Sequence, residues 1–184
     1  MIYVVVSVTR IYTHTMISEM SVKISTLDIA GIGAALKALR LPHKSVGDSV
    51  FFPLVIGVKD LELMSKLVKA GDEHAKVVRG IIVYAEITAP RYWWVEMDTY
   101  RIGTERLCSE STMHCEAKGL TGEELQRVKG ELKESHEQTR IQYFSYQTLR
   151  RIFIQREHHR LPEWHEFIGW MTSLPLSDKL IFVK

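Results

Sequence analysis

Apolar and polar positions along the chain predict a series of helices with a few strands among them. Residues 21–26 alternate between apolar and polar side chains, which indicates a strand with one buried face. Apolar residues then recur at helical spacing over 28–39, and Pro42 is expected to stop that helix. Residues 43–58, which contain two glycines and a proline, are predicted to form a loop.

The middle of the chain carries the clearest helix and the clearest strand. In the segment KDLELMSKLVKAG, Asp60 suits the N-cap of a helix and Gly71 suits its C-terminal end. One or two further helical turns are expected over 72–79. The run GIIVYAEITAP is rich in β-branched and aromatic residues, so it predicts a strand that Pro90 ends.

The second half of the chain is predicted to be mainly helical. A helix is expected from Pro90 to about Arg101, followed by a loop over 105–120 and a polar helix over 121–137. Two further helices, SYQTLRRIFIQREHH and PEWHEFIGWMTSL, and a short strand, KLIFVK, complete the chain. Because strands and helices do not alternate in βαβα order, the pattern predicts an α+β domain, mostly helical with a few strands.

The length of 184 residues suits one domain with a sizeable core. We expect residues 1–19 to be an N-terminal extension and residues 20–184 to form that single domain. The segment MIYVVVSVTRIYTHTM lacks a basic n-region and a small-residue cleavage site, so a signal peptide is not expected.

Composition and charge narrow the classes of partner. Hydrophobic residues make up 46% and charged residues 25%, the balance of an ordinary globular domain. A formal net charge of +2 gives no strong signal for nucleic acid. No apolar run approaches the roughly 18 residues of a membrane span. Two cysteines without a disulfide pattern favour the cytoplasm, or the host cytoplasm for a viral protein.

Familiar catalytic and metal motifs are missing from the sequence. It contains no glycine-rich dinucleotide or P-loop motif, no H-E-x-x-H and no G-x-S-x-G. His158 and His159 are adjacent, so on a helix they point about 100° apart and cannot both ligate one metal. We therefore predict no metal site and assign no catalytic residue.

The stretch EITAPRYWWVEMDTYRIGT is the most distinctive part of the chain, and two interpretations stay open for it. On a helix, Trp93, Met97 and Tyr100 share one face, so the aromatic residues can simply fill a core. Alternatively, they form the wall of a binding site that faces the hydroxyl-rich loop TERLCSESTMH, where arginines and hydroxyls offer phosphate donors.

The segment KLVKAGDEHAKVVRGIIVYAEITAPRYWWVEMDTYRIGT resembles the heart of flavin-dependent thymidylate synthases, as a divergent, phage-type member. The strand end, with Glu86, Ile87, Ala89 and Pro90, matches the family pattern without a gap. Residues 99–101 fall on the family's Arg-His-Arg triplet, and the segment RLCSES lies over its Asn-Glu-x-Ser-x-Arg segment. The likeness spans roughly residues 59–168. Uncharacterised phage-type proteins share the short runs YWW, DTY, STMH and LPEWHEF.

The resemblance implies a fold, a set of contact residues and a family chemistry. The fold is a mostly helical α+β domain with a small antiparallel sheet. The implied ligand-binding residues are Glu96, Arg101, Thr104, Ser109, Ser111 and Arg156. The implied cofactor-binding residues are His74, Tyr100 and Arg101.

Several of these positions depart from the family pattern. Only Arg101 remains of the basic triplet that holds the flavin phosphates, because Thr99 and Tyr100 replace the other two residues. Glu96 puts a carboxylate where the family has Gln, and Gln147 takes the place of the family's closing catalytic arginine.

Three hypotheses for the function follow. The first is a nucleotide-binding homo-oligomer, a tetramer by resemblance and viral in origin, that holds a nucleotide-type small molecule between subunits for sequestration or regulation, without flavin chemistry. The second is an active FAD-dependent thymidylate synthase that methylates dUMP. The third is a structural or interaction protein without any ligand. The expected cofactor is accordingly none or FAD, and no membrane partner is expected.

Overall fold

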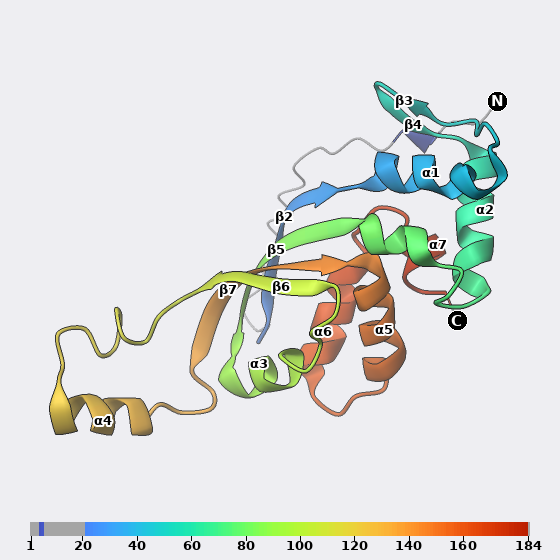
Figure 1. Cartoon of the computed structure of the whole chain (residues 1–184). Coiled ribbons are helices and arrows are strands. Elements are labelled where there is room, and N and C mark those ends of the chain that lie inside the picture. Colours follow the sequence, from blue (N-terminus) through green and yellow to red (C-terminus); the bar gives the residue numbers. More distant parts are fainter. Residues whose placement is uncertain (1–3, 6–20, 184) are drawn as a thin grey trace.

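The structure is a computed structural model that describes residues 4–5 and 21–183. Its centre is a four-stranded antiparallel sheet in the order β2-β5-β7-β6 (Figure 1). The strands span Lys23–Ala30 (β2), Ile82–Pro90 (β5), Glu137–Ser145 (β7) and Thr104–Ser109 (β6). The predicted extension, 1–19, lies outside the described residues except for a two-residue strand, β1 (Val4–Val5), so the domain boundary stays a prediction.

Three helices cover one face of this sheet. They are α3 (Arg91–Met97), α5 (Tyr146–Arg156) and α6 (Pro162–Met171), and Figure 1 shows them together below the strands. The strand residues that meet the helices are buried alternately along β5, at Val83, Ala85, Ile87 and Ala89. This alternation is the pattern of a strand with one face in the core, and it confirms the strand predicted for this segment.

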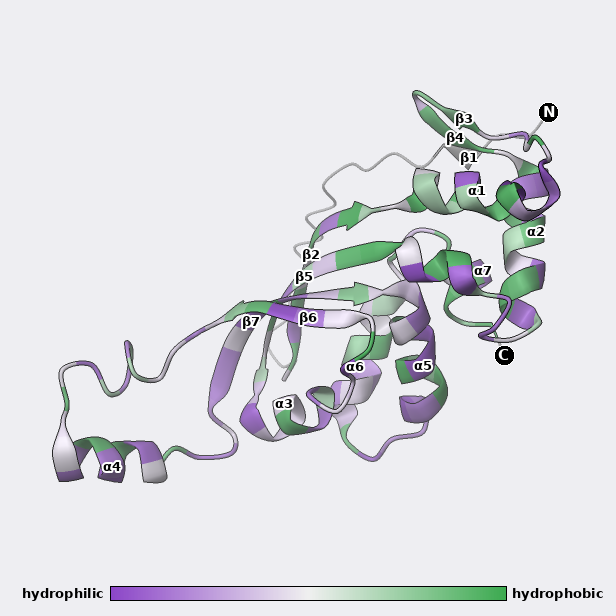
Figure 2. Ribbon diagram, viewed as in Figure 1, coloured by the Kyte–Doolittle hydropathy of each residue, from purple (hydrophilic) through white to green (hydrophobic). Residues whose placement is uncertain are grey.

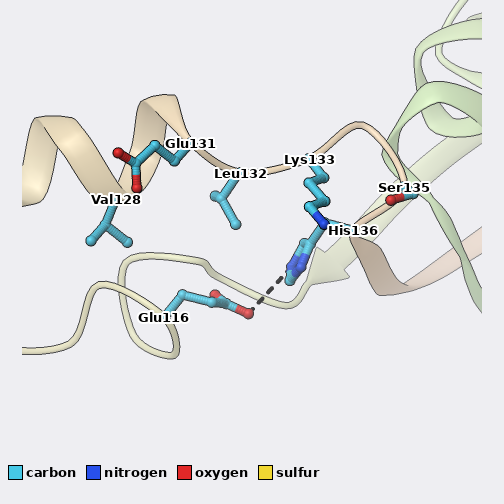
Figure 3. A pocket seen from close by; sticks show the side chains of 7 residues that line it. All are labelled: Glu116, Val128, Glu131, Leu132, Lys133, Ser135 and His136. Atoms are coloured by element: carbon cyan, nitrogen blue, oxygen red, sulfur yellow. Dashed lines mark ion pairs between the residues drawn. The ribbon is translucent and has the colours of Figure 1, made fainter.

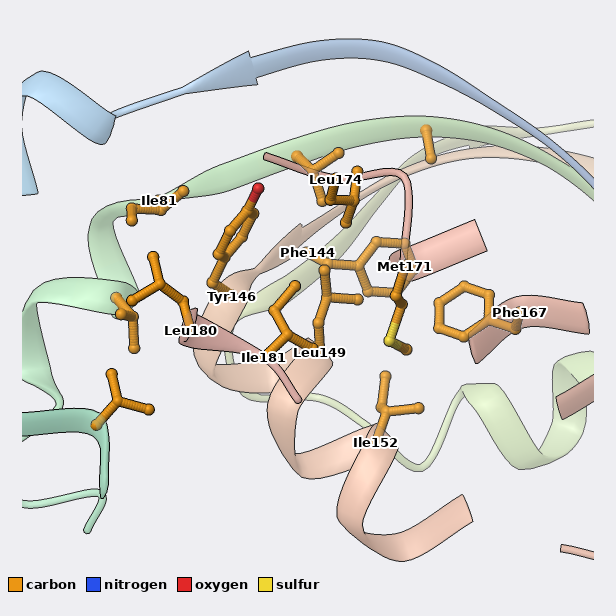
Figure 4. Close-up of a cluster of buried hydrophobic side chains, with 14 of the residues drawn as sticks. Ile81, Phe144, Tyr146, Leu149, Ile152, Phe167, Met171, Leu174, Leu180 and Ile181 are labelled. Atoms are coloured by element: carbon orange, nitrogen blue, oxygen red, sulfur yellow. The ribbon is translucent and has the colours of Figure 1, made fainter. Parts of the chain in front are cut away.

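The core between the sheet and the helices is strongly aromatic. Trp93 lies 5.0 Å from Trp164 and 5.5 Å from Phe167 between ring centroids, and all three side chains are fully buried. Figure 4 shows the neighbouring part of this core, where Phe167 from α6 faces Phe144 from β7. Trp93 therefore fills the core, as the first interpretation of the aromatic stretch expects, and Trp164 of the PEW run packs against it.

Each of two helices begins directly where a central strand ends. Pro90 ends β5 and is the N-cap of α3, and Ser145 ends β7 and is the N-cap of α5. The Ser145 hydroxyl accepts a hydrogen bond from the Thr148 amide at 3.2 Å, which satisfies one free donor of the first turn. Helix α3 ends at Met97, earlier than the predicted Arg101, and the chain leaves it in a tighter turn in which the Thr99 and Tyr100 amides donate to the carbonyls three residues before them.

A second group of helices packs at the other end of the sheet. It contains α1 (Ile32–Arg40), the turn η1 (Leu41–His43), α2 (Val58–Lys69), the turn η2 (Lys76–Gly80) and α7 (Ser177–Leu180). A small antiparallel sheet, β1-β4-β3, lies beside α1, with β3 at Val50–Phe51 and β4 at Leu54–Ile56. The loop predicted over 43–58 therefore contains a short hairpin.

The boundary between β2 and α1 corrects the predicted helix start. The strand continues to Ala30, and the helix begins at Ile32 rather than at residue 28. Gly31 separates the two elements with a φ of 89°, and a Cβ at this position would lie 1.8 Å from the Gly80 carbonyl oxygen. Only glycine fits both the backbone conformation and the close approach.

Asp60 was expected to cap α2, but the structure gives it another role. Helix α2 begins two residues earlier, and the carboxylate of Asp48 accepts from the amides of Lys59 and Asp60 in its first turn. Asp60 itself is 2% exposed and accepts hydrogen bonds from Arg40 Nε at 2.6 Å and from Ser49 Oγ at 2.6 Å. Burial alone would raise the pKa of Asp60, but the hydrogen bonds from Ser49 and Arg40 hold that pKa below its ordinary value.

Residues 110–136 form an arm that extends away from the sheet (Figure 1). It carries α4 (Gly122–Gly130), a polar helix without a buried residue, and most of its ribbon has the colour of hydrophilic residues in Figure 2. The predicted helix over 121–137 thus ends at Gly130, and the predicted loop over 105–120 begins with strand β6. The returning chain is fixed at the base, where the carbonyls of Glu134 and His136 accept from the amides of Tyr92 and Arg91.

The fold class is confirmed, with one element corrected at the C-terminus. Helices and a small antiparallel sheet make one α+β domain. The segment KLIFVK was expected to be a strand, but it begins with the end of α7 and then packs as irregular chain. Its side chains Leu180 and Ile181 are fully buried in the core shown in Figure 4.

Candidate functional site

A charged cluster lies where α3, α5 and α6 meet at the end of the aromatic core. The carboxylate of Glu96, on α3, accepts hydrogen bonds from Arg156 Nη1 at 2.7 Å and from the Trp164 indole at 2.9 Å. His159 Nε2 lies 3.4 Å from the same carboxylate oxygen. One acid therefore gathers side chains from the end of α5, from the following turn and from the start of α6.

The Arg156 guanidinium packs against two aromatic residues. Its centre lies 4.6 Å from the Trp164 ring and 5.6 Å from the Tyr100 ring, distances at which a cation is attracted by the ring face. Its Nε donates to the Tyr100 hydroxyl at 2.9 Å. The side chain is 17% exposed and that of Glu96 is 32% exposed, so both charged groups reach the surface. We refer to Glu96, Tyr100, Arg156, His159 and Trp164 as the α3–α5 corner.

A second arginine is buried beside this corner, and its position was not predicted. Arg140, on β7, is 7% exposed, donates to Asp98 at 2.8 Å and stacks at 4.2 Å from the Trp94 ring. Burial is the main cause that lowers the pKa of Arg140, and Asp98 opposes that shift. This pair ties the end of α3 to the sheet, which positions the corner without offering a free cation.

The phenol of Tyr92 and the carboxylate of Glu163 join the first turns of α3 and α6. The hydrogen bond from the Tyr92 hydroxyl to Glu163, followed by burial, raises the pKa of Tyr92 to about 12. Glu163 is 4% exposed, and its second oxygen has no hydrogen-bond partner among the described residues. These contacts fix the mutual placement of the two helices that contribute Glu96 and Trp164.

The structure brings together three of the predicted site residues and leaves the others apart. Glu96, Tyr100 and Arg156 meet in the α3–α5 corner, and Arg101 follows Tyr100 with an exposed side chain. Thr104 is buried, and its hydroxyl accepts from Gln142 at 2.7 Å.

The remaining predicted residues lie outside the corner. Ser109 ends β6, five positions beyond Thr104 on an extended strand, and Ser111 opens the arm, where its carbonyl accepts from the His114 amide. His74 lies on the loop after α2, and its side chain is exposed. That loop is bound to the first half of α5, because Asp72 pairs with Arg150 and Arg151.

The position that matches the family's closing catalytic arginine also holds a polar contact. Gln147 is 6% exposed, and its amide oxygen accepts from Arg79 Nε at 2.8 Å. The amide nitrogen of Gln147 is buried without a partner among the described residues. Arg79 reaches this position from η2, at the end of the segment where one or two helical turns were expected, and was not among the predicted site residues.

One hollow lies on the arm, away from the α3–α5 corner. It has a volume of about 350 Å³, and Figure 3 shows Val128 and Leu132 above an ion pair between Glu116 and His136, whose atoms lie 3.2 Å apart. A second hollow lies between α1 and the β3–β4 hairpin. Neither is lined by residues of the α3–α5 corner.

The described residues contain neither a candidate metal site nor a membrane-spanning helix. Among residues 4–5 and 21–183, no group of three His, Cys, Asp or Glu side chains could hold a metal ion. In the same part of the chain, no helix is long and apolar enough to cross a membrane.

Comparison with known proteins places this fold. No protein-family model matches the sequence. No curated protein matches it either. Solved structures do match, and they show that the chain has the fold of flavin-dependent thymidylate synthases.

Three of these structures are particular examples. Thymidylate synthase ThyX from Helicobacter pylori, solved with FAD and dUMP, has a TM-score of 0.70 at 15% identity, over 88% of this chain and 97% of that one. A second Helicobacter pylori ThyX structure with FAD and dUMP has a TM-score of 0.69 at 15% identity, over 88% and 100% of the two chains. The UMP/dUMP methylase PolB from Streptomyces cacaoi, bound with 5-Br dUMP, has a TM-score of 0.55 at 11% identity, over 86% and 93%.

Proposed function

We propose that this protein binds a nucleotide-type anion at the α3–α5 corner, between the subunits of a homo-oligomer, without flavin chemistry. The observation that carries the proposal is Arg156, a guanidinium that packs against Tyr100 and Trp164 at the protein surface. Its position is already fixed in the free protein, so a phosphate would meet a pre-oriented donor.

The corner offers the two kinds of contact that a nucleotide requires. Arg156 uses Nε and Nη1 within the protein and keeps Nη2 without a partner among the described residues, and the exposed Arg101 has no ion-pair partner there. Both can donate to phosphate oxygens. The ring of Tyr100 gives an aromatic surface on which a base can stack. Glu96 stands where an anion would bind Arg156, so an incoming phosphate competes with an internal carboxylate.

The solved structures support a nucleotide rather than another anion. The two ThyX structures contain dUMP, and the PolB structure contains 5-Br dUMP. The ThyX structures also contain FAD, but the donors in the triplet segment of this chain suit a flavin poorly. The Thr99 hydroxyl donates to the Glu96 carbonyl and the Tyr100 hydroxyl accepts from Arg156, so Arg101 is the one free cation of that segment among the described residues. A dinucleotide pyrophosphate needs more positive charge than this.

A second subunit would complete the site. The corner is open at the surface and neither described hollow lies there, so one chain buries little of a ligand. The arm provides a surface for association, because it extends from the sheet and packs few of its side chains on its own subunit. We propose a tetramer by analogy of fold. The viral setting, with sequestration or regulation of a nucleotide as the role, rests on the short runs shared with phage-type proteins.

The absorbance spectrum and nucleotide titrations of the purified protein test this proposal. We expect no flavin band, and we expect dUMP to raise the melting temperature, because a ligand that binds the native state stabilises it. A flavin band would contradict the proposal that flavin chemistry is lost and would support the active enzyme. No response to any nucleotide would leave the structural or interaction protein.

Substitution of Arg101 tests the location of the site. Arg101→Ala should weaken dUMP binding by roughly tenfold in calorimetry, because it removes one phosphate donor, while the melting temperature of the free protein stays unchanged. Arg106→Ala is the matched control, since Arg106 is also an exposed arginine but lies on β6 outside the corner. Equal affinity of the two variants would remove Arg101 from the site.

A further inference from the structure

The hollow between α1, the segment after it and the β3–β4 hairpin lies at the opposite end of the molecule from the arm (Figure 1). Its volume is about 190 Å³. We propose that this hollow binds the phosphate group of an organic phosphate, independently of the α3–α5 corner. The cations that line it are Lys37, Arg40 and Lys44, and we refer to it as the α1 pocket.

The charge of the α1 pocket favours an anion. Three cationic side chains line it, and the one acid among the lining residues, Asp60, is already bound by Arg40 and Ser49. Arg40 uses only Nε in that pair, which leaves both terminal nitrogens of its guanidinium without a partner among the described residues. Lys37 and Lys44 have no carboxylate partner in the same part of the chain. A phosphate dianion matches this excess of positive charge.

The C-terminal end of α1 does not cancel this attraction. Helix carbonyls at that end would repel an anion if they were free. Here the Arg40 carbonyl accepts from the Ser45 amide at 3.3 Å, and the Leu41 carbonyl accepts from the Lys44 amide at 3.1 Å. These two carbonyls are therefore satisfied by the chain itself, beside the cations that line the pocket.

The segment that closes the α1 pocket is held in place, so the site exists before a ligand arrives. Asp60 accepts from both the amide and the hydroxyl of Ser49, and the Ser49 hydroxyl accepts from the Gly57 amide. Gly47 sits so close to this acid that a Cβ there would lie 2.3 Å from its carboxylate. A fixed arrangement of donors loses less entropy on binding than a mobile loop would.

Apolar side chains at the rim of the α1 pocket indicate that the phosphate belongs to an organic molecule. Val46 is 95% exposed and Leu41 is 68% exposed, and both line the pocket beside Phe51, whose ring lies 5.5 Å from Lys37 Nζ. Inorganic phosphate has no apolar part that could contact these side chains, whereas the apolar body of an organic phosphate can cover them. The phosphate can come from a small organic phosphate or from a lipid headgroup, which share this chemistry.

Calorimetric titration with phenyl phosphate and with inorganic phosphate tests the proposal on the full chain. We expect both to bind, and phenyl phosphate to bind more tightly because its ring contacts the rim. Lys44→Ala and Lys37→Ala should each weaken the binding of phenyl phosphate by roughly tenfold. Lys59→Ala is the matched control, since Lys59 is an exposed lysine near the pocket that does not line it. Affinity equal in the wild type and in both pocket variants would overturn the proposal.

Two additional measurements identify the source of the phosphate and test whether the α1 pocket is independent of the α3–α5 corner. Vesicles that contain phosphatidate should retain the protein only if the ligand is a lipid headgroup, and retention should then be lost in Lys44→Ala. Arg156→Ala should lose dUMP binding at the corner but keep phenyl phosphate binding at the α1 pocket. If Arg156→Ala loses both ligands, the α1 pocket is not an independent site, and the inference fails even where the proposed function holds.

Discussion

Glu96 is the one carboxylate of the α3–α5 corner. Its carboxylate accepts from Arg156 and Trp164 and lies near His159, so three cationic or polar groups depend on one acid. A glutamine there would keep the length of the side chain but lose the charge. The consequence differs for stability and for binding, because the same carboxylate stabilises the free protein and competes with a bound anion.

Glu96→Gln should therefore separate these two effects. We expect a loss of about 1 kcal/mol in the free energy of unfolding, as for other partly exposed ion pairs, and a roughly tenfold gain in dUMP affinity. Chemical denaturation and calorimetry measure the two quantities. Asp98→Asn is the matched control, because Asp98 also holds an arginine at 2.8 Å, but that arginine is Arg140 and lies outside the corner. A dUMP affinity that does not rise in Glu96→Gln would show that the carboxylate does not compete.

At the scale of elements, Asp60 joins α1, α2 and the segment between them. Its carboxylate is buried with Arg40 and Ser49, so its removal leaves a guanidinium and a hydroxyl without their acceptor. Asp60→Asn should lower the free energy of unfolding by about 2–3 kcal/mol at neutral pH. Asp178→Asn, at an exposed acid, should change it little.

The pH dependence of this effect follows from the lowered pKa of Asp60. A depressed folded-state pKa contributes stability above the unfolded value of 3.8, and that stability is lost as the pH falls through the lower folded value. The difference in urea unfolding between the wild type and Asp60→Asn should thus be full at neutral pH and shrink below about pH 4. A difference that stays constant on acidification would contradict the assigned hydrogen bonds.

Elements with a regular apolar pattern were predictable, even where they also bury a few polar groups, and strands without that pattern were not. Strand β5 and helices α2, α5 and α6 follow the expected pattern. Strand β7 was missed because its buried face carries Arg140 and Gln142, whose partners Asp98 and Thr104 lie far away in sequence. Strand β6 was missed for a different reason: it is an edge strand that buries little beyond its first residue.

The residues of the candidate site were likewise predictable only in part. The resemblance named Glu96, Tyr100 and Arg156, and the structure places these three in one cluster. It also places Trp164 there, a residue of the predicted helix PEWHEFIGWMTSL that was not among the predicted site residues. No sequence pattern could indicate that the Trp164 indole would donate to Glu96, because that contact depends on how α6 crosses α3. Whether these residues bind a ligand stays a prediction.

At the scale of the whole molecule, the arm is a separate unit attached to a complete core. Replacement of residues 112–131 by a short Gly–Ser turn keeps Glu134 and His136, which bind the first amides of α3. Because α4 buries no side chain on its own subunit, we expect cooperative unfolding at nearly the same temperature. We also expect a smaller assembly in size-exclusion chromatography with light scattering.

The control for this deletion is the full chain at the same concentration. A variant with the mass of the full-length assembly would show that the arm does not hold the subunits together. A variant that fails to unfold cooperatively would show instead that the arm belongs to the core.

The strand order has a consequence for synthesis on the ribosome. β5 lies between β2 and β7, yet β7 is made only after the whole arm has been translated. Until then, the nascent chain exposes one unpaired edge of β5 and the apolar row at Val83, Ala85 and Ile87. Open edges and apolar rows of this kind bind chaperones or other nascent chains. The time taken to translate the arm therefore adds to the period in which the growing protein is vulnerable to aggregation.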